Sequence, residues 1–210
     1  MIRILIGDDH TIVREGLKQI LAETPNLMVA GEAGSGQDVL RRLREGRYDV
    51  VLLDISLEDR SGLDVLKHIR VEWPALPVLM LTMHPEEEYA VRALRAGAAG
   101  YLTKKSAATE LVAAIQKVAG GGRYVTASLA EVLARALEPA AAAVPHETLS
   151  DREFQVFERL VSGERPSDIA RRLGVSVKTV STHRARILVK MNMQTTAALI
   201  RYAVQHQLVK

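Results

Sequence analysis

The stretch Val50-Val51-Leu52-Leu53-Asp54 decides how the rest of the chain is interpreted. Four apolar residues, two of them β-branched, predict a short strand buried on both faces, as in a parallel sheet. The strand ends at a carboxylate, and open α/β sheets bind ligands just beyond the carboxyl ends of their strands. Asp54 is therefore either a turn residue that ends the strand or the chemical centre of a site.

Strand and helix patterns alternate on both sides of this stretch. Short apolar runs predict the strands, and apolar residues at helical spacing predict the helices between them. The expected strands are Ile2–Ile6, Leu27–Ala30, Val50–Leu53, Pro77–Leu81 and Gly100–Leu102. The expected helices are Thr11–Glu23, Asp38–Glu45, Ser61–Val71, Glu86–Ala96 and a last helix through Ala119 that Ser106 can N-cap. Repeated β-α units predict an α/β fold with a five-stranded, doubly wound parallel sheet.

The length and the charge distribution predict two domains. The 210 residues are enough for two cores. Residues 1–120 complete the α/β domain, residues 121–147 supply a helix (Ser128–Leu137) and a proline-bracketed linker (Glu138–His146), and residues 148–210 form a helical domain. Residues 146–210 hold 11 Lys and Arg against 6 Asp and Glu, whereas the preceding residues hold 17 against 19. A basic C-terminal domain predicts a polyanionic partner.

Several classes of protein are excluded by the composition. No apolar run approaches the roughly 18 residues that span a bilayer, so we expect no membrane partner. The N-terminus MIRILIGDDH turns acidic too early for a secretory signal. The chain has no cysteine, which excludes disulfides and thiolate metal sites.

Four strand ends carry residues suited to one chemistry. Asp8 and Asp9 follow the first strand, and Asp54, Thr82 and Lys104 follow the third, fourth and fifth. Clustered carboxylates repel one another unless a cation lies among them, and Mg²⁺ prefers such oxygen ligands. A carboxylate can also attack phosphorus to form an aspartyl phosphate, whose oxygens an ammonium and a hydroxyl stabilise. The ordinary alternatives are helix-capping acids, a strand threonine and a solvated lysine.

These residues, in this order, resemble the receiver domain of bacterial response regulators, a flavodoxin-like fold, throughout residues 1–120. The resemblance implies that Asp54 is the phosphoacceptor and that Thr82 and Lys104 sense the phosphoryl group. The Mg²⁺ ligands that it implies are Asp8, Asp9, Asp54 and the backbone carbonyl of Ser56. Tyr101 matches the family's aromatic switch residue; a half-buried tyrosine packed on the sheet edge is the alternative.

Two positions depart from the receiver pattern. Glu58 and Lys105 stand where the family often has proline, four residues after the phosphoacceptor and directly after the lysine. The first change puts Glu58 and Asp59 beside the acidic site. Their effect on metal affinity and on the rate of phosphorylation is left open by the sequence.

The C-terminal residues predict a helix-turn-helix. Ser150-Asp-Arg-Glu153 forms a capping box that opens a helix ending at Gly163, and Pro166 suits the first turn of a helix over Asp168–Leu173. The turn Gly174-Val175-Ser176 then leads into a helix over Lys178–Lys190, which would enter the major groove of DNA. Its expected inward residues are Val180, Ile187 and Leu188, and its expected outward residues are Lys178, Ser181, Thr182, Arg184 and Arg186. A merely solvated basic helix is the alternative.

The run from Leu149 to Ile187 resembles the LuxR-type helix-turn-helix, so that nearly the whole chain resembles a NarL/FixJ-type response regulator. Family pattern places Lys178, Ser181, Thr182 and Arg186 at the DNA. From their lengths we expect the hydroxyl residues at base edges and the long cations mainly at phosphates. The segment Arg165-Pro166-Ser167-Asp168 departs from the family's Ser-Asn-Lys-Glu, and Arg165 is a candidate to replace the lost lysine.

The resemblance implies a cytoplasmic transcription regulator rather than an enzyme. A sensor histidine kinase would phosphorylate Asp54, which would release a recognition helix masked by the receiver. The phosphorylated homodimer would then bind double-stranded promoter DNA, pairing through Ala198, Leu199, Tyr202 and Ala203 on a helix over Thr195–His206. Two alternatives are an aspartyl-phosphate phosphohydrolase, which usually needs a second acid where Ser56 stands, and a DNA binder whose receiver only docks proteins.

Overall fold

The chain is described by a computed structural model that covers residues 1–83, 86–137, 145–206 and 208. It divides into two compact units, Met1–Leu137 and Glu138–Lys210. Most of the predicted linker, residues 138–144, lies outside the described residues. Pro145 and His146, at its end, begin a 3₁₀ turn, η1, over Pro145–Thr148.

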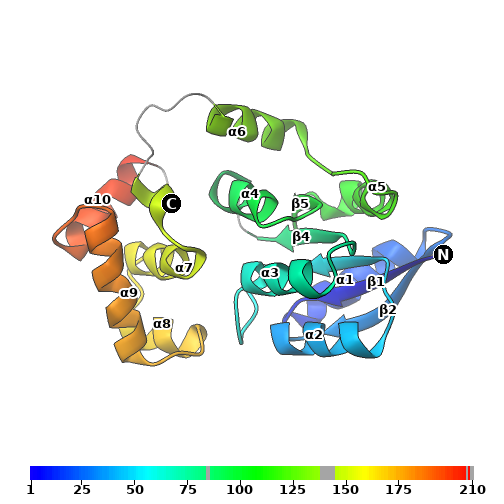
Figure 1. The fold of residues 1–210 in the computed structure, drawn as a ribbon, viewed down its shortest axis with the longest axis horizontal. Coiled ribbons are helices and arrows are strands. Elements are labelled where there is room, and N and C mark those ends of the chain that lie inside the picture. Colours follow the sequence, from blue (N-terminus) through cyan, green and yellow to red (C-terminus); the bar gives the residue numbers. More distant parts are fainter. Residues whose placement is uncertain (84–85, 138–144, 207, 209–210) are drawn as a thin grey trace. The chain divides into compact units, whose positions relative to one another are not determined.

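The first unit is built on a parallel sheet with helices on both faces (Figure 1). Its strands are β1 (Ile2–Gly7), β2 (Leu27–Ala33), β3 (Val50–Leu53), β4 (Val78–Thr82) and β5 (Gly100–Thr103). Their order is β2-β1-β3-β4-β5 and every pairing is parallel, which confirms the predicted five-stranded doubly wound sheet. β2 runs three residues further than predicted, because Gly31, Glu32 and Ala33 continue to pair with β1 despite their poor strand pattern.

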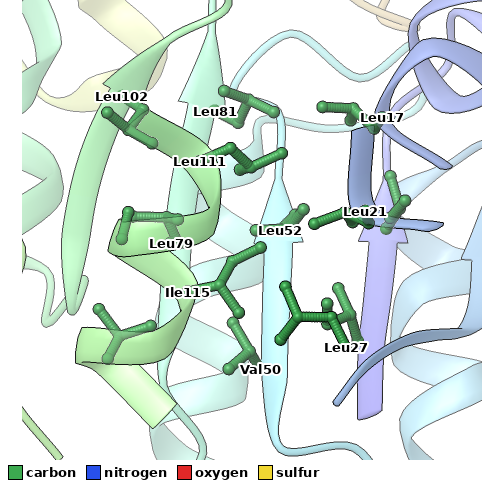
Figure 2. Packing of buried hydrophobic residues seen from close by; sticks show 14 residues of the cluster. Leu17, Leu21, Leu27, Val50, Leu52, Leu79, Leu81, Leu102, Leu111 and Ile115 are labelled. Atoms are coloured by element: carbon green, nitrogen blue, oxygen red, sulfur yellow. The ribbon is translucent and has the colours of Figure 1, made fainter. Parts of the chain in front are cut away.

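The helices between the strands follow the apolar periodicity. They are α1 (Thr11–Ala22), α2 (Gly36–Glu45), α3 (Gly62–Glu72), α4 (Glu86–Arg95) and α5 (Ala107–Ala119). On one face of the sheet, Leu17 and Leu21 of α1 and Leu111 and Ile115 of α5 pack with alternate strand residues, such as Leu52 (Figure 2). This alternation follows from the two-residue period of a strand. Because helices cover both faces of the sheet (Figure 1), all four residues of β3 are buried, as its sequence predicts.

One predicted helix cap is wrong. Ser106 stands at the N-cap position of α5, but its hydroxyl donates to the carbonyl of Thr103 at 3.0 Å and accepts no bond from the helix. Short polar side chains form such local bonds as readily as caps. After α5, a further helix, α6 (Ala127–Leu137), packs on α4.

Every regular element among the described residues of the second unit is a helix. Its helices are α7 (Asp151–Val161), α8 (Pro166–Arg172), α9 (Val177–Lys190) and α10 (Thr196–Gln205). The predicted capping box is confirmed: Ser150 accepts from the backbone N–H of Glu153, whose carboxylate accepts from that of Ser150. Gly163 and Gly174 follow α7 and α8 with φ of +83° and +62°, values that favour glycine and end each helix.

The apolar stripe of α10 belongs to the core of this unit. Leu199 and Ala203 have no exposed surface, Tyr202 is 8% exposed, and α10 packs on α7. The prediction that Leu199, Tyr202 and Ala203 form the dimer surface is therefore wrong, whereas Ala198, the fourth residue predicted there, is half-buried. A stripe at helical spacing indicates one buried face, and here the domain's own core buries it.

Candidate functional site

The carboxyl ends of β1 and β3 place two aspartates side by side. The backbone N–H of Asp54 donates to the carbonyl of Gly7 at 2.8 Å, and that of Asp8 donates to Ala33 at 3.0 Å, so the ladder continues one residue beyond each strand. Both aspartates are only 2% exposed. Their positions therefore follow from the register of the parallel sheet rather than from a loop.

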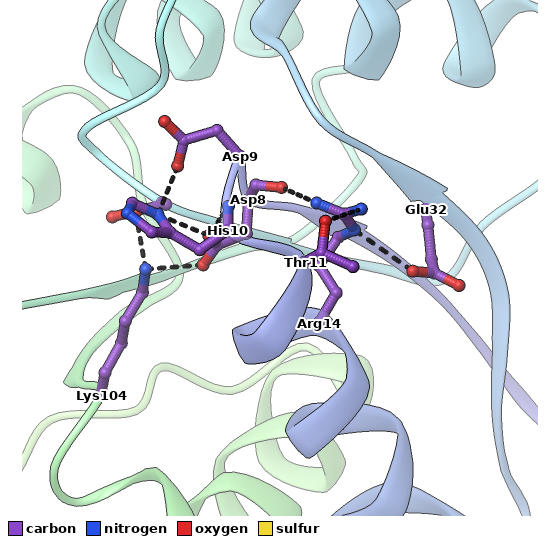
Figure 3. Close-up of polar contacts among 8 residues, drawn as sticks. Asp8, Asp9, His10, Thr11, Arg14, Glu32 and Lys104 are labelled. Carbon is purple, nitrogen blue, oxygen red and sulfur yellow. Dashed lines mark hydrogen bonds and ion pairs between the residues drawn. The ribbon is translucent and has the colours of Figure 1, made fainter.

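Lys104 joins these two aspartates from the end of β5. Its Nζ lies 2.6 Å from Asp8 Oδ2 and 2.7 Å from Asp54 Oδ2, and the side chain is only 8% exposed (Figure 3). Burial disfavours the ammonium, but attraction and hydrogen bonds from both carboxylates outweigh it and raise the pKa of Lys104. The site therefore holds a lysine that is firmly charged.

Asp9 and His10 complete an acidic cluster. Nδ1 of His10 lies 2.6 Å from Asp9 Oδ1, and the His10 side chain is 65% exposed (Figure 3). Burial raises the pKa of Asp9; attraction to His10 opposes this rise, and repulsion from Asp54 and Asp8 adds to it. Each of the residues Asp8, Asp9, His10 and Asp54 offers a ligand atom within 4.8 Å of the others. Such crowding of negative charge favours a bound cation.

The cluster fits a divalent metal ion. Its donors are mainly carboxylate oxygens, which hard cations such as Mg²⁺ prefer. Asp54 Oδ1 is buried and accepts no hydrogen bond within the described part of the chain, so one oxygen of the central carboxylate is left for a further partner. The arrangement is compatible with a divalent cation bound by Asp8, Asp9 and Asp54.

The remaining predicted site residues surround this cluster. Thr82 ends β4 with no exposed surface, and its carbonyl accepts from the backbone N–H of Lys104 at 2.7 Å. Tyr101 lies on β5, the edge strand of the sheet, and is fully buried rather than half-buried. Ser56 lies in a loop closed by an antiparallel bridge to Ser61. The roles assigned to these three residues stay predictions.

Two contacts that position Asp54 and its loop were not predicted from the sequence. Gly62 approaches the backbone of Asp54 so closely that a Cβ on it would lie 1.9 Å from the Asp54 carbonyl oxygen. The carboxylate of Asp59 accepts from the backbone N–H groups of Gly36 and Gln37, at 2.7 and 2.9 Å. Asp59 thus binds the N-terminus of α2, where the helix dipole favours an anion. The contact joins distant segments, so no local sequence signal reveals it.

The predicted DNA-contacting side chains lie on α9. All five are exposed, while Val180 and Ile187 are fully buried and Leu188 is half-buried, as the periodicity predicts. Three of the five make contacts within the unit. Ser181 and Thr182 donate to the carbonyls four residues earlier, each at 3.0 Å, and Arg184 Nε donates to Thr196 of α10 at 2.8 Å. Lys178 and Arg186 are long, exposed cations on the same helix, and their contacts to DNA phosphates stay predictions.

The fold and site define a class of protein, and comparison with known families identifies it. Residues 4–116 match the response regulator receiver domain, and residues 147–203 match the bacterial regulatory proteins of the luxR family. The chain therefore belongs to the response regulators, as a phosphorylation-controlled transcription regulator of the NarL/FixJ type.

Known response regulators match this chain over nearly its whole length. The chain is 35% identical to the response regulator UvrY of Escherichia coli, over 99% of this chain and 96% of that one. It is 37% identical to GacA of Pseudomonas viridiflava, over 100% and 98%. Among solved structures, the Salmonella typhimurium RcsB response regulator is similar with a TM-score of 0.71 at 25% identity, over 97% of both chains. A LuxR-family response regulator from Aurantimonas gives 0.61 at 36% identity, over 65% of this chain and 97% of that one.

Among the residues that the structure describes, no helix combines the length and apolar character that a membrane span requires.

Proposed function

We propose that Asp54 accepts a phosphoryl group from a sensor histidine kinase. The observation that carries this proposal is the state of its carboxylate: Oδ2 is held by Lys104, whereas Oδ1 has no hydrogen-bond partner among the described residues. Oδ1 attacks phosphorus, a new O–P bond forms, and the phosphorus–nitrogen bond to the kinase histidine breaks. The electron pair of that bond stays with the histidine nitrogen.

Asp8, Asp9, Asp54 and the carbonyl of Ser56 would hold Mg²⁺, which neutralises charge on the phosphoryl oxygens. Lys104 and the hydroxyl of Thr82 would stabilise the same oxygens from the opposite side. Supporting this division, Lys104 is charged and buried next to Asp54, and its backbone is bonded to that of Thr82. A movement of Lys104 or Thr82 would therefore displace the other residue through this backbone bond. Tyr101, three residues before Lys104 on β5, would change position with them.

The site would accept a phosphoryl group from the kinase rather than hydrolyse phosphomonoesters. Ser56 stands where phosphohydrolases of the aspartyl-phosphate class usually have a second acid, and its hydroxyl cannot serve as a carboxylate general acid at neutral pH. Incubation with a phosphomonoester and Mg²⁺ should therefore release no more phosphate than the Asp54→Asn variant does. Sustained turnover above that background would overturn this proposal.

The output would be binding of the α9 helix to double-stranded promoter DNA by a dimer. The net charge of the C-terminal residues and the exposed cations of α9 support it. RcsB, one of the similar structures, is described as undergoing conformational dynamism for DNA interaction. Such a promoter partner would place the regulator in the cytoplasm. The dimer surface must lie outside the buried stripe of α10.

The test measures whether phosphorylation of the first unit changes the DNA affinity of the second. A duplex selected from a random pool is titrated with the full chain, with and without a small phosphodonor and Mg²⁺. We expect affinity to rise with phosphorylation in the wild type and to stay constant in Asp54→Asn. In Lys104→Ala, Asp54 should still be labelled while DNA affinity no longer responds. A receiver that serves only for docking would give labelled protein with unchanged affinity.

A further inference from the structure

A cavity of about 230 Å³ lies at the edge of the sheet opposite the acidic cluster. Pro77 and Ala99 line it, and these residues directly precede β4 and β5, whereas Thr82 and Lys104 follow those strands. Its lining is small or apolar except for two arginines, Arg70 of α3 and Arg123 after α5. The proposed phosphorylation chemistry uses none of these residues.

Arg70 is held rigidly in this cavity. Its Nη2 donates to the carbonyl of Trp73 at 3.2 Å and to that of Leu76. Its aliphatic stem crosses Gly97, where φ is +98° and a Cβ would lie 2.7 Å from Arg70 Cδ. The Nε atom is nevertheless buried and makes no hydrogen bond to any described residue. Two backbone carbonyls thus fix Nη2 of Arg70, while its Nε is buried without an acceptor, which is energetically costly.

Arg123 adds a second positive charge to the same cavity. It is exposed, and within the described ranges it forms no ion pair or hydrogen bond. Burial, together with repulsion from Arg123, lowers the pKa of Arg70. The lining contains no carboxylate that could offset this repulsion. A bound anion would do so.

We infer that this cavity binds a small phosphate-type dianion between Arg70 and Arg123. A dianion neutralises both guanidinium groups, whereas a monocarboxylate neutralises one. The planar fork of Arg123 can bind phosphate oxygens with paired, charge-assisted hydrogen bonds, while Arg70 adds its fixed positive charge. The volume is below the roughly 300–1,000 Å³ of pockets for drug-sized ligands, which limits the ligand to a free phosphate or a small phosphomonoester.

The test follows the amide resonances of Gly97, Gly121 and Gly122 in the full chain during titration with inorganic phosphate. Ionic strength is held constant, and Mg²⁺ is omitted so that the acidic cluster takes no part. We expect saturable shifts. Arg123→Ala should weaken phosphate affinity about tenfold or more, as expected for loss of a charged hydrogen bond. Arg47→Ala, which removes an exposed arginine outside the cavity, should leave it unchanged.

Two further titrations distinguish binding in this cavity from binding at the acidic cluster and from general anion attraction. Asp54→Asn should bind phosphate as the wild type does, because the acidic cluster is not involved. Glycerol phosphate binding more tightly than phosphate identifies a phosphomonoester as the ligand, and the reverse order identifies the free ion. Succinate binding as tightly as either, equal affinity in Arg123→Ala, or shifts that never saturate would each overturn the inference.

Discussion

Replacing Lys104 by Met should change the stability of the first unit by an amount that depends on Mg²⁺. In the wild type, one ammonium lies 2.6 and 2.7 Å from two buried carboxylates. Its removal leaves Asp8 and Asp54 facing each other without a counter-charge. Breaking a buried ion pair by removing one partner costs about 3–5 kcal/mol, and we expect a loss of that order without metal.

Mg²⁺ should offset most of this loss, because a divalent cation supplies the missing charge at the same carboxylates. The lysine in turn repels the metal: two unit charges 4 Å apart interact by about 4 kcal/mol at an effective dielectric constant of 20. A repulsion of even a third of that energy would weaken Mg²⁺ binding by about a factor of ten. Lys104→Met should therefore bind Mg²⁺ at least about tenfold more tightly than the wild type does.

The assay is urea unfolding of the full chain, followed by the fluorescence of Trp73. This residue is the chain's single tryptophan and lies in the first unit, so it reports that unit alone. Lys105→Met is the matched control, because its side chain is adjacent in sequence but exposed. An equal loss of stability with and without Mg²⁺, or Mg²⁺ affinity no higher than in the wild type, would refute the competition between Lys104 and the metal.

Three further outcomes follow from single contacts. Gly62→Ala should cost about 2 kcal/mol or more and slow the labelling of Asp54, because its Cβ would meet backbone that cannot rotate away; Gly16→Ala, with open space around it, should do neither. Asp59→Asn should lower the urea stability of the first unit by about 1 kcal/mol through the N-terminus of α2. Burial opposes the charge on Glu153, but bonds from a lysine of α9 and from its own capping box lower its pKa below the ordinary 4.5. Its stabilisation is therefore present above pH 4.5 and lost as the pH falls through the folded-state pKa. Hydrogen exchange of the α7 amides should show Glu153→Gln less protected than the wild type above pH 4.5, and the two converging below it.

The sheet and the acidic cluster could be predicted because both follow from general geometry. A buried parallel strand such as β3 needs continuous apolar residues, and the carboxyl ends of parallel strands share one edge. Side chains placed directly after those strands must therefore meet, whatever the loops do. Asp8, Asp54 and Lys104 lie together for this reason.

The parts that could not be predicted depend on distant contacts or on choices between equal local options. The Ser106 hydroxyl could either cap α5 or bond to the preceding turn. The backbone of Ser106 is helical (φ −83°, ψ −10°) rather than extended as in most N-cap residues, and its hydroxyl bonds to Thr103. Asp59 looked like a charge added to the metal cluster, but a long-range contact assigns its carboxylate to α2. The apolar stripe containing Leu199 is compatible with either a core or a dimer surface, because periodicity reports that a face is buried and not by which chain.

The same contacts that neutralise the resting site determine what phosphorylation must disturb. Lys104 is bound at Nζ to Asp8 and Asp54 and at its backbone N–H to the carbonyl of Thr82. A phosphoryl group on Asp54 Oδ1, as proposed above, would move negative charge outward from the carboxylate, so the ammonium could follow it only by leaving Asp8 or by shifting the end of β5. A shift of β5 acts on Thr82 through the backbone bond, and α4 begins four residues after Thr82. Because α4 packs on β5 and α6 packs on α4, such a shift of β5 would have a packed route to the last helix of the first unit.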